Sequence, residues 1–310
     1  MDKVLFLVGP TGSGKSELAL AVAKKLNGEI ISCDAMQVYR KMDIGTAKPT
    51  PQEQKAVPHY LIDLISPKSE CSVFKHRELA LEAIRKIQSK GRLPIVAGGS
   101  GFYVKAILDG ISLQPDQESK VRKALKTQRA KHGLSYLYAK LKRIDPKRAK
   151  EIHSNDERRI IRALEIFELS RKKPSKWHEE TSGNLESQGF KPLVFGLMRA
   201  REELYQRIES RVDRMFEAGW VKEVKRLKRA GFSKTARAAI GYRQILEYLQ
   251  GKKSLEEAQS EIKKRTRHLA KRQLTWFRRD SRIRWVSVSG ARFVPKAAQN
   301  IMRQFKRARV

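Results

Sequence analysis

GPTGSGKS, the stretch formed by Gly9, Pro10, Thr11, Gly12, Ser13, Gly14, Lys15 and Ser16, fills every fixed position of the phosphate-binding loop pattern G-x-x-x-x-G-K-[ST]. Its context agrees, because the apolar run Lys3–Val8 before it is typical of a strand and Glu17–Leu26 after it has helical spacing. In such a loop the backbone N–H groups surround phosphate oxygens and the following helix presents its positive N-terminus. The lysine contacts the terminal phosphates, and the hydroxyl of Ser16 reaches a magnesium ion. The sequence therefore predicts a site for a diphosphate or polyphosphate.

The chain is strongly basic, and most of the excess charge lies away from this loop. The 310 residues include 67 Lys and Arg against 33 Asp and Glu, a formal net charge of +34. Residues 1–110 hold 16 basic and 11 acidic side chains, whereas residues 201–310 hold 30 and 11. Such an excess indicates a polyanionic partner, most simply a nucleic acid, for the middle and C-terminal parts of the chain. Because no apolar run approaches the roughly 20 residues that cross a bilayer, we expect a soluble cytoplasmic protein without a membrane contact.

The first hundred residues alternate between strands and helices. We expect further strands at Glu29–Cys33, Tyr60–Leu64 and Leu93–Ala97, with a helix at Val73–Lys90 and another after Gly101. This alternation around a phosphate-binding loop predicts an α/β fold in which a parallel sheet has helices on both faces. Ligands of such sheets bind at the carboxyl ends of the strands. Asp34 and Ser100 should therefore lie beside the loop.

From about residue 113 the pattern changes to helices alone. We expect an all-helical insertion domain at 113–191, between a first part of the core at 1–112 and a helix-rich, basic C-terminal part at 192–310. Asp145-Pro146 and Asn155 or Asp156 read as helix starts, and Lys172–Lys191 reads as a loop or mobile segment. The strand pattern of Leu193–Met198 then resumes the sheet. Helices follow at 202–218, 221–229, 240–249 and 255–279, with a last strand at 284–288 and a last helix at 295–306.

Two acidic residues bear on the chemistry. Asp34 stands where an acceptor substrate would meet the phosphates, so its carboxylate could take a proton from that substrate, although a turn cap is an equally good interpretation of its position. Phosphate-loop ATPases usually place an acid at the end of an apolar strand to order magnesium, and only Asp63 could serve here. This disfavours a motor or switch and favours a transfer enzyme that uses the loop as a diphosphate cradle.

Two basic helices have alternative interpretations. Arg207, Arg211 and Arg214 share one helix face, either as a solvated face or as an anion clamp. In Glu261–Arg279, a ladder of cations is more suited to phosphates than to bare solvent, whereas Trp276 and Phe277 are more often core anchors than base-stacking platforms.

These stretches together resemble the bacterial tRNA dimethylallyltransferase family, which is similar to isopentenyl transferases of other kingdoms. The resemblance covers nearly the whole chain. It rests on GPTGSGKS, Ile31–Pro49, Pro58–Asp63, Gly98–Tyr103 (GGSGFY), Asp145–Glu165, Ile240–Arg243 and Thr266–Arg278 in the family's order.

The resemblance implies transfer of a dimethylallyl group from its diphosphate, held with Mg²⁺ by the loop, to N6 of the adenosine on the 3′ side of the anticodon. It implies that Asp34 is the general base, that Ser100, where threonine is usual, orients the amine, and that Arg211 holds the leaving diphosphate with help from Arg207. Ser16 also stands where threonine is common. In family terms the helical insertion grips the anticodon stem.

The resemblance also implies contacts with tRNA from several segments. These are Asp34, Ala35, Met36 and Gln37, then Ser100, Arg122, Arg158, Arg159, Ile160, Ile161 and Arg162, then Ala238, Ala239, Ile240, Gly241, Tyr242 and Arg243, and finally Lys271, Arg272, Gln273, Leu274, Thr275, Trp276, Phe277 and Arg278. The expected partners are thus tRNA and dimethylallyl diphosphate, and the expected form is a monomer.

Two other functions remain alternatives. An adenylate isopentenyltransferase acting on free AMP or ATP would keep the loop and Asp34 but would have no use for the positive charge or the insertion. A nucleic-acid-binding ATPase would need a second acidic motif, which the sequence does not offer.

Overall fold

The core of the fold is a parallel sheet made of β1 (Asp2–Val8), β2 (Gly28–Ser32), β3 (His59–Tyr60), β4 (Leu93–Gly98), β5 (Phe190–Met198) and β6 (Arg284–Ser287) in the order β3-β2-β4-β1-β5-β6. This is a computed structural model that describes residues 2–111, 120–181 and 183–308. In the register of the sheet, Val8 lies opposite Gly98 and Ser32 lies opposite Ala97. The segments that follow β1, β2 and β4 therefore leave the sheet at the same edge, as the sequence predicted for Asp34 and Ser100.

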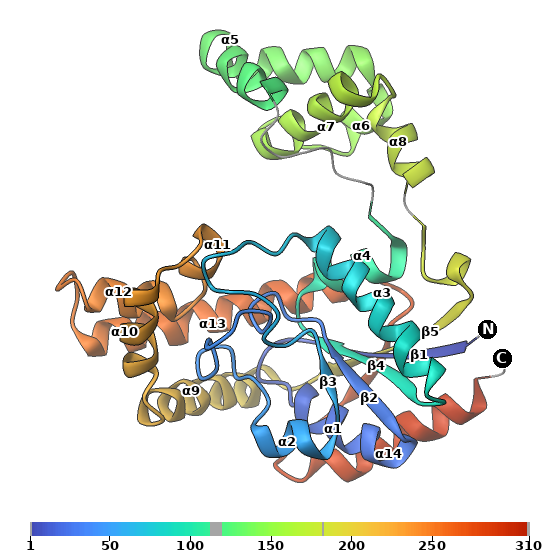
Figure 1. Ribbon diagram of the computed structural model, residues 1–310, viewed down its shortest axis with the longest axis vertical. Coiled ribbons are helices and arrows are strands. Elements are labelled where there is room, and N and C mark those ends of the chain that lie inside the picture. The colour runs from blue at the N-terminus through green and yellow to red at the C-terminus, as the bar shows by residue number, and fades with distance from the viewer. Residues whose placement is uncertain (1, 112–119, 182, 309–310) are drawn as a thin grey trace. The chain divides into compact units, whose positions relative to one another are not determined.

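Helices cover both faces of this sheet (Figure 1). The described residues of the two units together form the helices α1 (Lys15–Leu26), α2 (Pro51–Ala56), α3 (Val73–Ser89), α4 (Gly101–Asp109), α5 (Lys120–Ile144), α6 (Pro146–Lys150), α7 (Glu157–Ser170), α8 (Pro174–Thr181), α9 (Arg201–Glu217), α10 (Trp220–Ala230), α11 (Lys234–Arg237), α12 (Tyr242–Tyr248), α13 (Leu255–Phe277) and α14 (Phe293–Arg307), with a 3-10 turn at Glu186–Gln188, and α5 to α8 belong to the insertion and not to the layers on the sheet. None of the described helices is long and apolar enough to cross a membrane.

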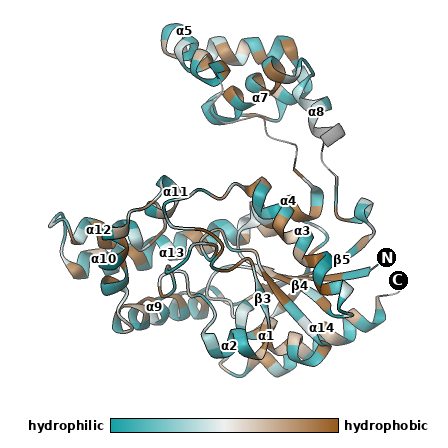
Figure 2. Cartoon of the chain, in the orientation of Figure 1, coloured by the Kyte–Doolittle hydropathy of each residue, from teal (hydrophilic) through white to brown (hydrophobic). Residues whose placement is uncertain are grey.

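The sheet is buried on both sides, as a doubly covered parallel sheet requires. Leu5 and Leu7 of β1 pack in one core cluster with α1 and with Phe293 and Ile301 of α14, whereas α3 packs against β2 and β4. Figure 2 shows the corresponding hydrophobic residues along the strands. The α/β fold with a phosphate-loop core is confirmed.

A second core lies beside the sheet and joins the segment after β2 to the C-terminal helices. Tyr39 and Met42 pack there with Trp220 of α10, Tyr242 of α12 and Ile262 of α13. Figure 1 shows α9 to α13 gathered on the side of the sheet away from the two termini. This core positions the residues that follow β2 against α9, α10 and α12.

The chain divides into two compact units. The core unit comprises Met1–Leu108 and Gly189–Val310, and the insertion unit comprises Asp109–Gln188. The insertion unit has a hydrophobic core of its own, in which Leu137 and Leu141 of α5 pack against Ile160 and Leu164 of α7.

One predicted strand is much shorter than expected. The sequence pattern predicted Tyr60–Leu64, but β3 contains only His59 and Tyr60. Leu61 and Asp63 have φ values of 62° and 56°, in the left-handed region, which ends the extended backbone. Instead, the N–H groups of Asp63 and Leu64 bond the carbonyls of Gln37 and Val38, so this segment follows the loop after β2 rather than the sheet.

The prediction of a loop at Lys172–Lys191 is also partly wrong. Pro174–Thr181 forms α8, whose first turn is fixed when Ser175 donates its N–H to Asp145 Oδ2 at 2.7 Å. Residue 182 lies outside the described residues, as do residues 112–119 at the expected start of the insertion. Two short helices, α2 and α11, were not predicted. The first is fixed by a capping box between Thr50 and Glu53.

Candidate functional site

The phosphate-binding loop joins β1 to α1 and depends on its glycines. Gly9, Gly12 and Gly14 have φ values of 145°, 81° and 95°, which side chains rarely tolerate. There is also no room for a side chain at two of these positions. A Cβ on Gly9 would lie 2.9 Å from the carbonyl oxygen of Leu197, and one on Gly14 would lie 2.2 Å from Cζ of Phe293. The loop is therefore held between β5 and α14.

Lys15 begins α1 and turns back over the loop. Its Nζ donates a hydrogen bond to the carbonyl oxygen of Pro10 at 2.7 Å. Burial lowers the pKa of Lys15 to about 7, and the nearby Arg211 charge lowers it too, whereas the Asp34 carboxylate opposes the shift. An anion bound in the loop would be the counter-charge that this ammonium lacks.

Two arginines of α9 reach the loop from the other side. Arg207 Nε donates to the carbonyl oxygen of Gly12 at 3.0 Å while its Nη2 pairs with Glu17 at 2.8 Å. Arg211 Nη1 donates to Thr11 Oγ1 at 3.4 Å, and burial lowers the pKa of this guanidinium. Both guanidinium groups thus contact the phosphate-binding loop, which is the position that the anion-clamp interpretation requires. Arg214 is exposed instead and bonds the Ser210 carbonyl within its own helix.

Asp34 and Ser100 meet at the edge of the sheet where β2 and β4 end. Asp34 Oδ1 accepts the N–H of Met36 at 2.8 Å, and Ser100 Oγ accepts the N–H of Ala35 at 3.2 Å. The turn-cap interpretation of Asp34 therefore holds for one oxygen. The other oxygen has no partner among the described residues and stays free to accept a proton.

Gln273 of α13 links two of these loops. Its Oε1 accepts the N–H of Thr11 at 2.8 Å and its Nε2 donates to the carbonyl oxygen of Gly99 at 2.9 Å. A Cβ on Gly99 would lie 2.6 Å from Nε2, and one on Gly101 would lie 2.3 Å from the Trp276 ring, so both glycines allow α13 to approach. Sequence reasoning placed Gln273 only among tRNA contacts and gave no signal for this bridge.

These groups open into one cavity of about 600 Å³. Its polar lining includes Thr11, Asp34, Ser100 and Arg211, and Phe102 and Trp276, which are 51% and 39% exposed, also line it. Its other lining residues are Ala35, Met36, Gly45, Thr46, Gly99, Gly101, Tyr103, Ile208, Val212, Met215, Trp220, Ala238, Ala239, Ile240, Tyr242, Thr266, Leu269, Arg272 and Gln273.

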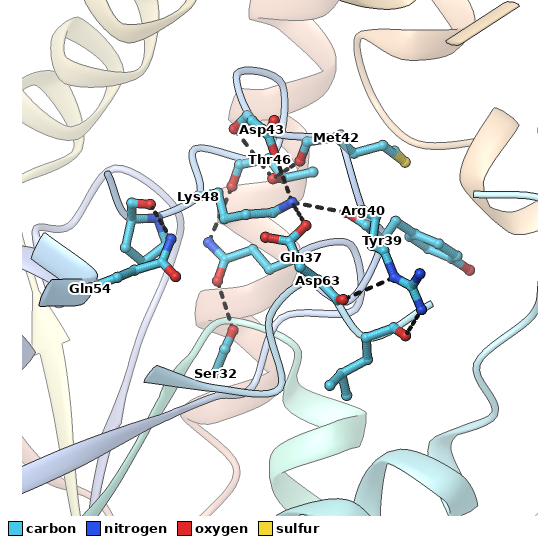
Figure 3. A network of polar contacts seen from close by, with 12 residues as sticks. Ser32, Gln37, Tyr39, Arg40, Met42, Asp43, Thr46, Lys48, Gln54 and Asp63 are labelled. Atoms are coloured by element: carbon cyan, nitrogen blue, oxygen red, sulfur yellow. Dashed lines mark hydrogen bonds and ion pairs between the residues drawn. The ribbon is translucent and has the colours of Figure 1, made fainter. Parts of the chain in front are cut away.

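The loop after β2 is fixed by a polar network (Figure 3). Gln37 Oε1 accepts from Ser32 Oγ at 2.7 Å, and Gln37 Nε2 donates to the carbonyl oxygens of Thr46 and Ala47 at 3.3 and 3.2 Å. The amide of Gln37 is therefore engaged within the protein, next to the proposed base Asp34.

Lys48 holds the far side of the same loop (Figure 3). Its side chain is 3% exposed, and Nζ donates to Tyr39 O at 2.9 Å, Asp43 Oδ1 at 2.7 Å and Asp63 Oδ1 at 2.6 Å. Asp63, the acid that the sequence offered as a magnesium ligand, thus serves this ion pair.

Glu223 of α10 fixes the turn formed by Asp43, Ile44 and Gly45, and sequence reasoning did not predict this role. It is 4% exposed and accepts the N–H groups of Asp43, Ile44 and Gly45 at 2.9, 2.8 and 3.3 Å. Tyr242 O–H donates to it at 2.7 Å, and burial together with this carboxylate raises the pKa of Tyr242. The only signal in the sequence is an acid in the apolar stripe of α10.

The remaining residues expected at tRNA in the core unit lie on α12 and α13 or just before them. Gly241 is the N-cap of α12, and Arg243 is exposed and pairs with Glu247 at 2.9 Å. On α13, Lys271 and Thr275 are exposed, Leu274 is half-buried, and Phe277 is buried as a core anchor, while the C-cap residue Arg278 is exposed.

In the insertion unit, the expected contact residues divide into buried and exposed sets. Arg122 and Arg162 both pair with the buried Glu165, at 2.5 and 2.8 Å. The side chains of Ile160 and Ile161 pack in the core of the unit. Arg158 and Arg159 are exposed, and Arg159 pairs with Asp156 at 3.2 Å.

Comparisons with known proteins identify the family of the chain. The model of the family described as IPP transferase matches residues 37–280. A tRNA dimethylallyltransferase of Acetivibrio thermocellus is 46% identical over 93% of this chain and 92% of its own, and one of Carboxydothermus hydrogenoformans is 46% identical over 97% and 96%.

Solved structures are similar along the whole chain as well. A tRNA isopentenylpyrophosphate transferase of Bacillus halodurans has a TM-score of 0.72 at 38% identity, covering 99% of this chain and 97% of its own. A eukaryotic dimethylallyltransferase described as acting on tRNA has a TM-score of 0.83 at 28% identity, covering 100% and 81%. Because the family model matches residues 37–280, most of the chain, and the two tRNA dimethylallyltransferases above are 46% identical over more than nine tenths of it, the protein belongs to the IPP transferase family.

Proposed function

We propose that the core unit transfers a dimethylallyl group from dimethylallyl diphosphate to N6 of the adenosine on the 3′ side of the anticodon in tRNA. The observation that carries this proposal is the single cavity into which the phosphate-binding loop at Thr11, the carboxylate of Asp34 and the buried guanidinium of Arg211 all open. The similarity to curated tRNA dimethylallyltransferases supports it.

The reaction suits the positions of these groups. The N6 nitrogen forms a bond to C1 of the dimethylallyl group while the C1–O bond breaks and its electron pair leaves with diphosphate. Lys15, Arg211 and the loop N–H groups stabilise the charge that gathers on the departing diphosphate. Asp34 accepts the N6 proton through its free oxygen, and the hydroxyl of Ser100 orients the amine.

The rest of the cavity suits an apolar group and an extruded base. Ile208, Val212 and Met215 give an apolar wall for the dimethylallyl chain. The adenine must leave its stack to reach Asp34, and the exposed rings of Phe102 and Trp276 offer surfaces for bases at the cavity.

Magnesium fits this site as an ion carried by the diphosphate. Among the described residues, no group of three or more His, Cys, Asp or Glu side chains is placed to hold a metal. Mg²⁺ is commonly bound by one or two protein groups together with substrate phosphates and water. The exposed hydroxyl of Ser16 would supply the protein ligand, and the ion would neutralise charge on the leaving group. We also propose that the protein acts as a monomer in the cytoplasm.

The first experiment is transfer of radiolabelled dimethylallyl group to unmodified anticodon stem-loop RNA and, in parallel, to AMP. Asp34→Asn separates the two roles of this residue, because its amide oxygen keeps the hydrogen bond from Met36 N–H while the proton acceptor is lost. We expect label in the RNA alone, with the rate reduced about 10²- to 10⁴-fold in the variant.

Three results would contradict the proposal. Label in AMP would assign a nucleotide prenyltransferase, and RNA-stimulated ATP hydrolysis without transfer would assign an ATPase. If Asp34→Asn kept full activity while Asp34→Ala were inactive, Asp34 would serve only to cap the turn and would not be the general base.

A further inference from the structure

Helix α10 carries a stripe of cations that no described acid neutralises. Lys222, Lys225, Arg226 and Arg229 lie at spacings of three and four along the helix, and all four are exposed. None of them forms an ion pair or hydrogen bond with another described residue. The opposite face, with Trp220, Val224 and Leu227, is buried in the core beside the sheet.

The neighbouring helices behave differently. On α13, Lys263 pairs with Asp213 at 2.6 Å and Arg267 pairs with Glu209. On α9, Arg207 pairs with Glu17. Some cations of these neighbouring helices are thus neutralised by an acid of another element, whereas the four cations on α10 are not.

Helix stability does not account for the stripe. Like charges at these spacings repel each other, and a cation such as Lys222 in the first turn opposes the helix dipole. The acid of the first turn, Glu223, faces inward and is engaged by the turn at Asp43–Gly45. Only Arg229, in the last turn, has a favourable position on helical grounds.

In the sequence, the stripe lies between two residues that line the cavity. Trp220, the first residue of α10, lines the cavity, and so does Ala238, which follows α11 directly. An eleven-residue helix is about 16 Å long, so the whole stripe is within about one helix length of the cavity wall. The stripe itself, from Lys222 to Arg229, is about 10 Å long, which matches about three or four successive phosphates of one nucleic-acid strand.

From these observations we propose that Lys222, Lys225, Arg226 and Arg229 form a binding site for the phosphate backbone of the tRNA substrate, separate from the residues that contact the reacting nucleotide. The inference rests on the proposed function, since a polynucleotide whose base enters the cavity extends its backbone away from it in both directions. When such cations bind phosphates, the counterions condensed on the nucleic acid are released, so the site contributes mainly to salt-dependent affinity.

The test is a fourfold variant in which all four residues become glutamine, a good helix former without charge. Binding of an unmodified tRNA transcript is measured by titration between about 50 and 200 mM salt. The matched control changes Lys296, Arg303, Lys306 and Arg307 of α14 to glutamine, because these are also exposed, have no ion-pair partner among the described residues and remove the same charge.

We expect the α10 variant to bind tRNA at least about tenfold more weakly at the low-salt end and to lose about two units of the slope of log K against log salt. Its KM for dimethylallyl diphosphate should stay at the wild-type value, and its thermal midpoint should not fall, because the like charges removed repel each other along the helix. A double variant, Lys225→Gln with Arg229→Gln, should lose about half of the slope change, and it keeps the test available if the fourfold variant fails to fold.

An unchanged slope in both α10 variants would overturn the inference and leave the stripe as a solvated face. So would an equal loss in the α14 control, because that would be an effect of net charge alone. If wild-type protein transfers no dimethylallyl group to tRNA, the proposed function has failed instead, so the two failures are distinguishable.

Discussion

Lys15 has a pKa of about 7 because it is buried and lies near Arg211. The protonated form binds the donor diphosphate, so below pH 7 the free enzyme already carries the required charge. Above that pH the proton must be taken up on binding, and the KM for dimethylallyl diphosphate should rise, approaching tenfold for each pH unit. Steady-state kinetics across neutral pH check this expectation.

Lys15→Arg gives the matched control, because an arginine stays charged throughout this range. Its KM should be nearly independent of pH, even if the absolute value is higher than that of the wild type. A wild-type KM that is constant from about pH 7 to 9 would mean that Lys15 keeps its proton in the free enzyme.

Single residues also show how far the sequence could predict the site. Asp34 and Ser100 could be placed because they follow strand ends beside a phosphate-binding loop. Helical spacing only grouped Arg211 with Arg207 and Arg214, and the family resemblance singled it out. The structure brings Asp34, Ser100 and Arg211 to one cavity. The roles of Gln273 and Glu223 could not be found, since each bonds backbone groups that are distant in sequence. No local pattern records such pairings.

At the level of elements, α10 supports the loop after β2 through one carboxylate. Replacing Glu223 with glutamine puts an amide group, itself a donor, among three backbone N–H groups and the Tyr242 hydroxyl. We expect a loss of about 1–3 kcal/mol in the free energy of unfolding, because a buried donor loses its acceptor. Urea denaturation measures it.

Glu78→Gln on α3 is the control for this change. Its carboxylate pairs with Lys75 at 3.6 Å between two exposed side chains, a kind of pair that contributes only about 0–1 kcal/mol. Equal losses in the two variants would contradict a special role for the Glu223 contacts.

Long elements were easier to predict than short ones. The periodicity of α9 and the apolar run of β1 are decided by burial, which the sequence records directly. Tyr60–Leu64 has the composition of a strand, yet left-handed backbone at Leu61 and Asp63 ends it, because hydrogen bonds to the loop after β2 replace those of the sheet.

At the level of the whole molecule, the two units have separate hydrophobic cores. Calorimetry should therefore show two unfolding transitions rather than one. Leu164→Ala, in the core of the insertion unit, should destabilise that unit by about 2–5 kcal/mol and move one transition only.

Ile208→Ala in the core unit is the reciprocal control and should move the other transition. If each substitution shifts both transitions equally, the units unfold together. The division into a sheet-containing core and a helical insertion could be anticipated because hydrophobic periodicity changes along the chain, whereas its boundaries depend on tertiary contacts.

Gln273 joins, through one side chain, the loop for the donor and the helix expected to meet the RNA. If binding of one substrate displaces α13, the loop that binds the other substrate therefore shifts with it. Thermodynamic linkage makes this exchange reciprocal: the factor by which tRNA changes the affinity for the donor is the factor by which the donor changes the affinity for tRNA.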